Sequence, residues 1–136
     1  MVCIQCSGPT RVFNSRLKKR LNQVWRRREC EHCGLIFTSL EEIDYKTSLA
    51  VRDADGRLQP FSRDKLLLSL HKSLQHRPTA LSDASALTDT VIARLLSQTQ
   101  HSAINDRGIV TTAYLVLARF DTVASVHYQA FHKMSD

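Results

Sequence analysis

The sequence predicts an α+β fold in which a small N-terminal unit of short antiparallel strands precedes a β-hairpin and about four helices. Three observations predict this order. Four cysteines, arranged as two Cys-x-x-Cys pairs, lie within the first 33 residues. An Asp-Gly turn between β-forming residues follows at positions 55 and 56. Beyond residue 62 the apolar residues recur at helical spacing.

The cysteine pairs are typical of a tetrahedral metal site. Each x-x spacing lets two sulfurs reach one ion from a tight turn, and Zn²⁺ takes four thiolates at ~2.3 Å in closed structural sites. We therefore expect one structural Zn²⁺ ion to be held by the four cysteines, Cys3, Cys6, Cys30 and Cys33. Two disulfides or free thiols are the alternatives. No secretory signal precedes Cys3, so we expect a reducing compartment, in which disulfides are rare.

The residues between the metal turns favour strands. β-forming residues concentrate in three segments, at 10–14, 22–28 and 35–39. Three short strands with two metal turns make a zinc ribbon. A unit of this size buries too little apolar surface to be stable alone, and metal ligation supplies the missing stability. A connector follows at 41–46, and we expect two domains, 1–46 and 47–136.

The positive charge lies almost entirely on the first of these domains. Residues 1–40 carry eight basic and two acidic side chains, a net charge of +6, whereas residues 41–136 carry 11 of each. Seven of the basic residues fall within 16–28, where no acid interrupts them. Four thiolates and one Zn²⁺ ion would offset only part of this excess. The distribution predicts contact with nucleic acid, and a solvated charged face is the alternative.

An arginine run precedes the second cysteine pair. If it forms a strand, alternation places Arg26 and Arg28 on one face, and Arg27 with Trp25 on the other. The metal would fix the backbone beneath these side chains. Guanidinium groups held in this way make bidentate contacts with phosphates or with guanine edges.

The sequence of the second domain predicts a β-hairpin followed by four helices. We expect strands at 48–52 and 57–61 around a turn at 53–56. The expected helices are 63–76 with Ser62 as N-cap, 83–99 with Ser82 as N-cap, one from Asn105 or Asp106 to Arg119, and one that begins at Asp121. Lys65 lies in the first turn of its helix, where unpaired N–H groups favour an anion, although such lysines are most often structural.

The order of these features resembles one family. A zinc ribbon, an arginine run and the pattern V-x(4)-G-x(3)-PF-x(3)-KL over residues 51–66 are similar to the NrdR family of bacterial repressors of ribonucleotide reductase genes. The resemblance also covers Ser15-Arg16, Arg26-Arg27-Arg28-Glu29-Cys30, Phe37-Thr38, Arg77-Pro78 and F-D-x-V-A at 120–124. It implies an N-terminal zinc ribbon and an ATP-cone domain, in a DNA-binding repressor that senses ATP against dATP and changes its oligomeric state.

The resemblance also implies roles for single residues. Zinc would be held by the four cysteines, and DNA would be contacted by Arg16, Arg26, Arg27 and Arg28. The nucleotide pocket would be lined by Val51, Lys65 and Leu66, with Gln59 and Ser62 at neighbouring positions. Asp53 and Ala54 stand where the family usually carries a Lys-Arg pair. Arg52 and Arg57 are the cations that would take over the role of that pair.

Other function classes fit the sequence less well. No apolar stretch approaches the ~20 residues of a membrane span. The sequence shows no Ser-His-Asp or Cys-His constellation of the kind that catalytic sites use. A closed zinc site does not activate water, so we expect that the protein is not an enzyme. The expected partners are double-stranded operator DNA, a nucleotide effector and further copies of the chain, in the bacterial cytoplasm at the nucleoid. Three alternatives remain: a protein-binding regulator of a reductase, an accessory subunit of a nucleic-acid-processing enzyme, and a family member without nucleotide control.

Overall fold

The computed structural model describes residues 1–133, and the chain forms two compact units, Met1–Asp44 and Tyr45–Asp136. The last three residues of the expected domain 47–136 lie outside the described residues. The α+β fold class is confirmed, because an antiparallel ribbon that carries the cysteines is followed by a hairpin and helices. Each unit is described by itself. None of the helices within residues 1–133 has the length and apolarity to cross a membrane.

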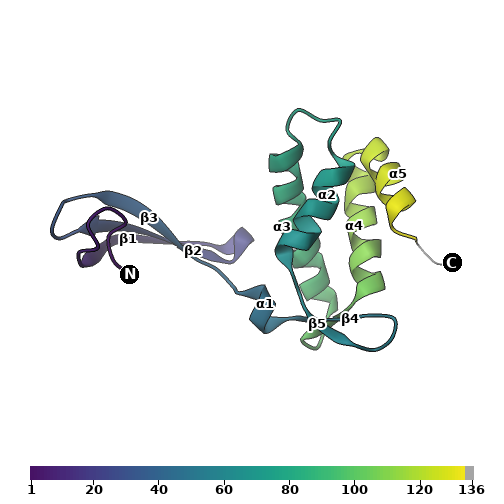
Figure 1. Cartoon of the computed structure of the whole chain (residues 1–136), viewed down its shortest axis with the longest axis horizontal. Coiled ribbons are helices and arrows are strands. Elements are labelled where there is room, and N and C mark those ends of the chain that lie inside the picture. Colours follow the sequence, from purple (N-terminus) through teal and green to yellow (C-terminus); the bar gives the residue numbers. More distant parts are fainter. Residues whose placement is uncertain (134–136) are drawn as a thin grey trace. The chain divides into compact units, whose positions relative to one another are not determined.

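The first unit is a three-stranded antiparallel sheet in the order β1-β2-β3 (Figure 1). Its strands are β1 (Thr10–Lys18), β2 (Gln23–Cys30) and β3 (Ile36–Glu41). All three predicted strands are present; β2 and β3 begin one residue later than predicted, and each strand ends two to four residues later. A single 3₁₀ turn, Lys19–Leu21, joins β1 to β2, and Asn22 ends it in the left-handed region with φ 48°.

The second unit combines a small sheet with a helix bundle. Its elements are α1 (Tyr45–Ser48), β4 (Ala50–Arg52), β5 (Leu58–Pro60), α2 (Arg63–Ser73), α3 (Ala80–Gln98), β6 (Ala103–Asn105), α4 (Asp106–Phe120) and α5 (Thr122–Phe131). The sheet order is β5-β4-β6, with β4 parallel to β6. In Figure 1, β4 and β5 lie at one end of helices α2, α3 and α4. The four long helices were predicted, whereas α1 and β6 were not.

Two predicted helix caps, Ser62 and Asn105, are confirmed, and Asp121, predicted as the start of the last helix, is its N-cap. Ser62 Oγ accepts a hydrogen bond from the Lys65 amide at 3.2 Å. Asn105 Oδ1 caps α4, and Asp121 Oδ1 caps α5. Each cap satisfies one of the amides that have no partner inside the helix.

The predicted N-cap of the second helix, Ser82, is wrong. Helix α3 begins at Ala80, and Ser82 Oγ donates to the Thr79 carbonyl at 3.0 Å. A local cluster of side chains explains the earlier start of the helix. Asp83 accepts from Arg77 Nε at 2.9 Å and from Thr79 Oγ1 at 2.7 Å, which holds the first turn of α3 against the end of the preceding segment.

One apolar core holds the second unit together. Seven apolar residues of this core are fully enclosed with 0% exposure: Leu70, Leu74, Ala84, Val91, Ala113, Leu117 and Ala124. Phe61, from the end of the hairpin, and Tyr128, from α5, fill the remaining space at 2% exposure each. The hairpin is thereby fixed to the bundle, and Val51 packs against the same core.

Candidate metal centre and nucleic-acid interface

The four cysteine sulfurs converge at one end of the ribbon. All four Sγ atoms lie within 4.8 Å of one another, and none is in a disulfide. The Sγ atoms of Cys3 and Cys33 are 3.7 Å apart, and those of Cys6 and Cys30 are 3.4 Å apart. A tetrahedral site with Zn–S bonds of ~2.3 Å separates its sulfurs by about 3.8 Å. The donor set and its spacing therefore fit a structural Zn²⁺ ion.

Two tight loops present the sulfurs. The first closes through a hydrogen bond from the Cys3 amide to the Gly8 carbonyl at 2.9 Å, with Ser7 at φ 58°. In the second, the amides of His32 and Cys33 each donate to Cys30 Sγ at 3.4 Å. Amides that donate to a sulfur stabilise its thiolate, which is the form that binds metal.

The thiol pKa values follow from this geometry. The amide of Cys33, followed by that of His32, lowers the pKa of Cys30 to about 6. The Gly8 amide lowers the pKa of Cys6, but the sulfurs of Cys30 and Cys33 outweigh it and raise that pKa to about 12. Crowded sulfurs resist carrying several negative charges, and a bound dication removes this conflict.

A β-bulge decides which side chains share a face of the ribbon. Val12 pairs with Arg28, but Asn14 pairs with Arg27, so Phe13 is an extra residue in β1. Without the bulge, Phe13 itself would oppose Arg27. The shift instead pairs Asn14 with Arg27 and Arg16 with Trp25, so the side chains of Asn14 and Arg16 lie on the same face as that of Arg27.

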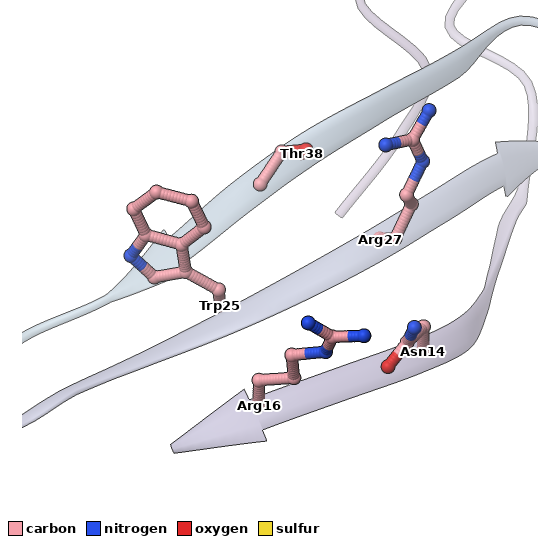
Figure 2. A pocket seen from close by; sticks show the side chains of 5 residues that line it. All are labelled: Asn14, Arg16, Trp25, Arg27 and Thr38. Carbon is pink, nitrogen blue, oxygen red and sulfur yellow. The ribbon is translucent and has the colours of Figure 1, made fainter. Parts of the chain in front are cut away.

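These side chains line a shallow pocket of about 290 Å³ on one face of the sheet. Figure 2 shows Asn14 and Arg16 on β1, Trp25 and Arg27 on β2, and Thr38 on β3. Within residues 1–133, the side chains of Arg16 and Arg27 have no hydrogen bond or ion pair. Lys18 adds a charge nearby, with Nζ 3.1 Å from the centre of the Trp25 ring. Asn14 and Thr38 were missed by the sequence analysis, because finding them requires the cross-strand register.

The two other predicted DNA contacts, Arg26 and Arg28, lie on the opposite face. Arg26 binds Glu41 at 3.0 Å and Ser15 Oγ at 3.2 Å. Arg28 donates to Ser39 Oγ at 2.9 Å. The predicted alternation along the arginine run is therefore present, and it separates the engaged guanidinium groups of Arg26 and Arg28 from the unengaged group of Arg27.

The predicted nucleotide-binding residues lie on the hairpin and on the first turn of α2. Val51 on β4 is the cross-strand partner of Gln59 on β5. Ser62 and Lys65 flank the start of α2, and Leu66 is buried in the core. The amide of Lys65 already donates to Ser62 Oγ, so an anion at this helix start would compete with that hydroxyl.

The two substitute cations flank the hairpin turn. Arg52 Nη1 donates to the Gly56 carbonyl at 3.4 Å, and the side chain of Arg57 is exposed. Between them, Asp53 Oδ1 accepts from the amides of Asp55 at 3.0 Å and Arg57 at 2.9 Å. The carboxylate therefore closes the turn, at the position where the resemblance leads us to expect a cation.

Comparisons with known proteins agree with the ribbon geometry. Residues 1–41 match the family model described as the N-terminal domain of NrdR-like transcriptional repressors. Proteins named Transcriptional repressor NrdR from Staphylococcus aureus strains JH9, Newman and JH1 are each 33% identical to this chain over 134 residues. Each match covers 98% of this chain and 85% of the relative.

Proposed function

The chain belongs to the NrdR family of transcriptional repressors, and on this premise we propose that it is a zinc-dependent repressor that binds operator DNA through its N-terminal ribbon. The observation that carries the proposal is the convergence of four thiols at one end of a ribbon that holds the chain's excess positive charge. Its named relatives are regulators of transcription rather than enzymes.

The ribbon has the properties that DNA binding requires. Zinc ligation at Cys3, Cys6, Cys30 and Cys33 would tie the C-terminal end of β2 to the two cysteine loops, so the cationic side chains would start from a fixed backbone. Contacts from Arg16, Arg26, Arg27 and Arg28 would neutralise phosphates and release counterions, which makes the affinity fall steeply with salt. The family resemblance names ribonucleotide reductase genes as the targets.

A gel-shift experiment tests this proposal. Zinc-loaded protein is titrated against a duplex from the promoter of the source organism's ribonucleotide reductase genes, and against a scrambled duplex of equal length. We expect the protein to bind the promoter duplex more tightly than the scrambled duplex. We also expect the affinity for each duplex to fall as the salt concentration rises. Equal affinity for the two duplexes would favour a general nucleic-acid-binding accessory subunit, and no binding would favour a docking module for protein.

The second unit would act as an ATP-cone that makes DNA binding depend on ATP and dATP. Val51, Gln59, Ser62, Lys65 and Leu66 would surround the nucleotide, and Arg52 and Arg57 would face its phosphates. A nucleotide changes DNA affinity only if it binds the DNA-competent state with a different affinity. Calorimetric titration of ATP and of dATP into zinc-loaded protein, with and without promoter duplex, measures that difference.

A second candidate is a repressor without nucleotide control. The supporting observation is that Asp53 closes the hairpin turn with its own carboxylate, beside the exposed Asp55. Two carboxylates at this position oppose a polyphosphate. No heat and no thermal stabilisation on addition of either nucleotide would select this candidate and leave the DNA-binding proposal intact.

Assembly of several copies would align several ribbons along the operator, at the bacterial nucleoid in the cytoplasm. Helix α5 supports this part of the proposal, because Val123 and Val126 are 63% and 62% exposed and the helix carries no Lys, Arg, Asp or Glu. Light scattering after size-exclusion chromatography, with each nucleotide in turn, tests it. A mass that corresponds to one protein chain under every condition, including one chain per duplex when promoter DNA is present, would exclude assembly.

A further inference from the structure

We propose that the two faces of the ribbon have different tasks: the face with Asn14, Arg27 and Thr38 contacts DNA bases, whereas the face with Arg26 and Arg28 stabilises the sheet. This inference rests on the proposed DNA-binding function. It narrows four candidate arginines to two, Arg16 and Arg27, and it adds two uncharged residues, Asn14 and Thr38, for which the sequence predicted no binding role.

One face of the ribbon carries a row of side chains that have no internal hydrogen-bond partner. Asn14, Arg27 and Thr38 are direct cross-strand neighbours on β1, β2 and β3. Neighbouring strands lie ~4.8 Å apart, so the three side chains form a continuous polar line across the sheet. All three residues are exposed, and within the described part of the chain their side chains make no hydrogen bond. Their donors and acceptors are therefore available to a ligand.

The corresponding side chains on the other face of the sheet have hydrogen-bond partners within the ribbon. Ser15, Arg26 and Ser39 are cross-strand neighbours on the other face. Arg26 donates to Ser15 and is paired with Glu41, and Ser39 accepts from Arg28. Moving these guanidinium groups to DNA would break contacts that the sheet already has. A group whose partner is internal gains less from a phosphate than a group whose only partner is water.

The bulge at Phe13 explains how the available groups came to share one face. Bulges re-aim side chains, and they are frequent beside functional sites. Here the extra residue brings Arg16 and Lys18 to the face of Arg27, whereas a regular strand would have placed Ser15 and Leu17 there. The result is a face with three cations around the exposed ring of Trp25.

The chemistry of this face suits the edges of bases in a duplex. The major groove is wide enough, at ~12 Å, to admit a β-ribbon. Arginine there pairs with guanine, asparagine pairs with adenine, and threonine contacts either the polar edge or the thymine methyl group. Asn14 and Thr38 carry no charge, so they add nothing to counterion release. Their contribution would appear as sequence preference, whereas that of Arg16 would appear in the salt dependence.

The test compares substitutions that change the charge equally. Arg27→Gln and Arg26→Gln each remove one positive charge from adjacent positions of β2. Arg11→Gln is the matched control on β1, because Arg11 is already paired with Glu29 at 2.6 Å. Affinity for the reductase-promoter duplex and for its scrambled partner is measured by fluorescence anisotropy at several salt concentrations. Zinc content and melting temperature are recorded for every variant.

We expect Arg27→Gln to weaken promoter binding by about 10- to 100-fold with unchanged zinc content and melting temperature. Arg26→Gln should lose several-fold less affinity than Arg27→Gln, and should lower the melting temperature more. Asn14→Ala and Thr38→Ala should reduce the preference for the promoter without changing the salt dependence, and Arg16→Gln should make that dependence shallower.

The outcomes separate this inference from the proposed function. If the wild-type protein binds neither duplex, or binds both equally, the proposed function fails first. If it prefers the promoter, but Arg26→Gln reduces affinity as much as Arg27→Gln at unchanged melting temperature, the division between the faces is overturned. If Asn14→Ala and Thr38→Ala both keep the full promoter preference, the contact with bases is overturned.

Discussion

The sulfur atom of Cys6 lies 3.4 Å from that of Cys30, although 24 positions separate the two residues. The contact brings the first cysteine loop onto the end of β2, directly after the arginine run. An ion bound between these loops would tie the strand that carries the arginines to the N-terminal loop. The ribbon's order and its DNA contacts should therefore depend on the same ion.

Substitution of one ligand tests the structural role of the metal. Cys30→Ser should abolish stoichiometric zinc binding and disorder the ribbon, because structural zinc supplies the folding free energy of such small units. Trp25, the only tryptophan, lies in β2 and reports this change by fluorescence. The helical circular dichroism of the second unit should persist. A variant that retains one zinc ion and wild-type fluorescence would contradict the assignment.

The loop at Gly8 has no room for a side chain. A Cβ atom there would lie 2.7 Å from His32 Nδ1 and 3.2 Å from Cys6 Sγ. We expect Gly8→Ala to destabilise the metal loops by about 1–3 kcal/mol, as overpacking does. Competition with a chromogenic chelator measures the corresponding loss of zinc affinity. Adding His32→Ala should restore part of it, and a double variant no better than Gly8→Ala would show that the histidine is not the obstacle.

Asp121 links three parts of the second unit. Its Oδ1 caps α5, and its Oδ2 accepts from Arg77 Nη1 at 2.9 Å and lies 3.0 Å from His76 Nε2. The Ala124 amide, together with His76 and Arg77, lowers the pKa of Asp121 to about 2. The unfolded value is ~3.9, so the carboxylate stabilises the fold fully above pH ~4 and loses this effect as pH falls towards 2.

Asp121→Asn should therefore lower the free energy of unfolding by about 1 kcal/mol or more at pH 7, and by progressively less between pH 4 and 2. Urea unfolding followed at 222 nm measures both values. Asp64→Asn, on the exposed first turn of α2, serves as the control. A deficit that stays constant down to pH 2 would show that the charge of Asp121 is not responsible.

Two leucines on α2 provide a matched pair for the core. Leu70 is 0% exposed, and Leu68 is 63% exposed. Leu70→Ala should cost about 2–5 kcal/mol of stability, because it removes buried methyl groups and leaves a cavity. Leu68→Ala should change stability by less than about 0.5 kcal/mol. Equal effects of the two substitutions in urea unfolding would contradict the packing of α2.

The features predicted from sequence depend on short-range chemistry. The spacing within each Cys-x-x-Cys pair brings its two sulfurs close together through a short local turn. Ser62 and Asp121 cap helices by bonding amides three residues ahead, a relationship visible in the sequence. The alternation of Arg26 and Arg27 follows from strand geometry alone.

The features that could not be predicted depend on contacts between distant segments. The strand β6 has only three residues, and it exists because it pairs with β4, where Ala50 is matched with Ala103. The bulge at Phe13 depends on the register between β1 and β2. Without that register, the sequence does not show which arginines have internal partners.

Binding of the promoter duplex by one preparation in three states tests the central claim most directly. Anisotropy titrations are performed with zinc-loaded protein, with protein stripped by a chelator, and with the stripped protein after zinc is restored. We expect removal of zinc to weaken promoter binding at least about tenfold and to erase the preference over the scrambled duplex, and restoration to recover both. Stripped protein that binds the promoter with the affinity and preference of the zinc-loaded form would contradict the claim.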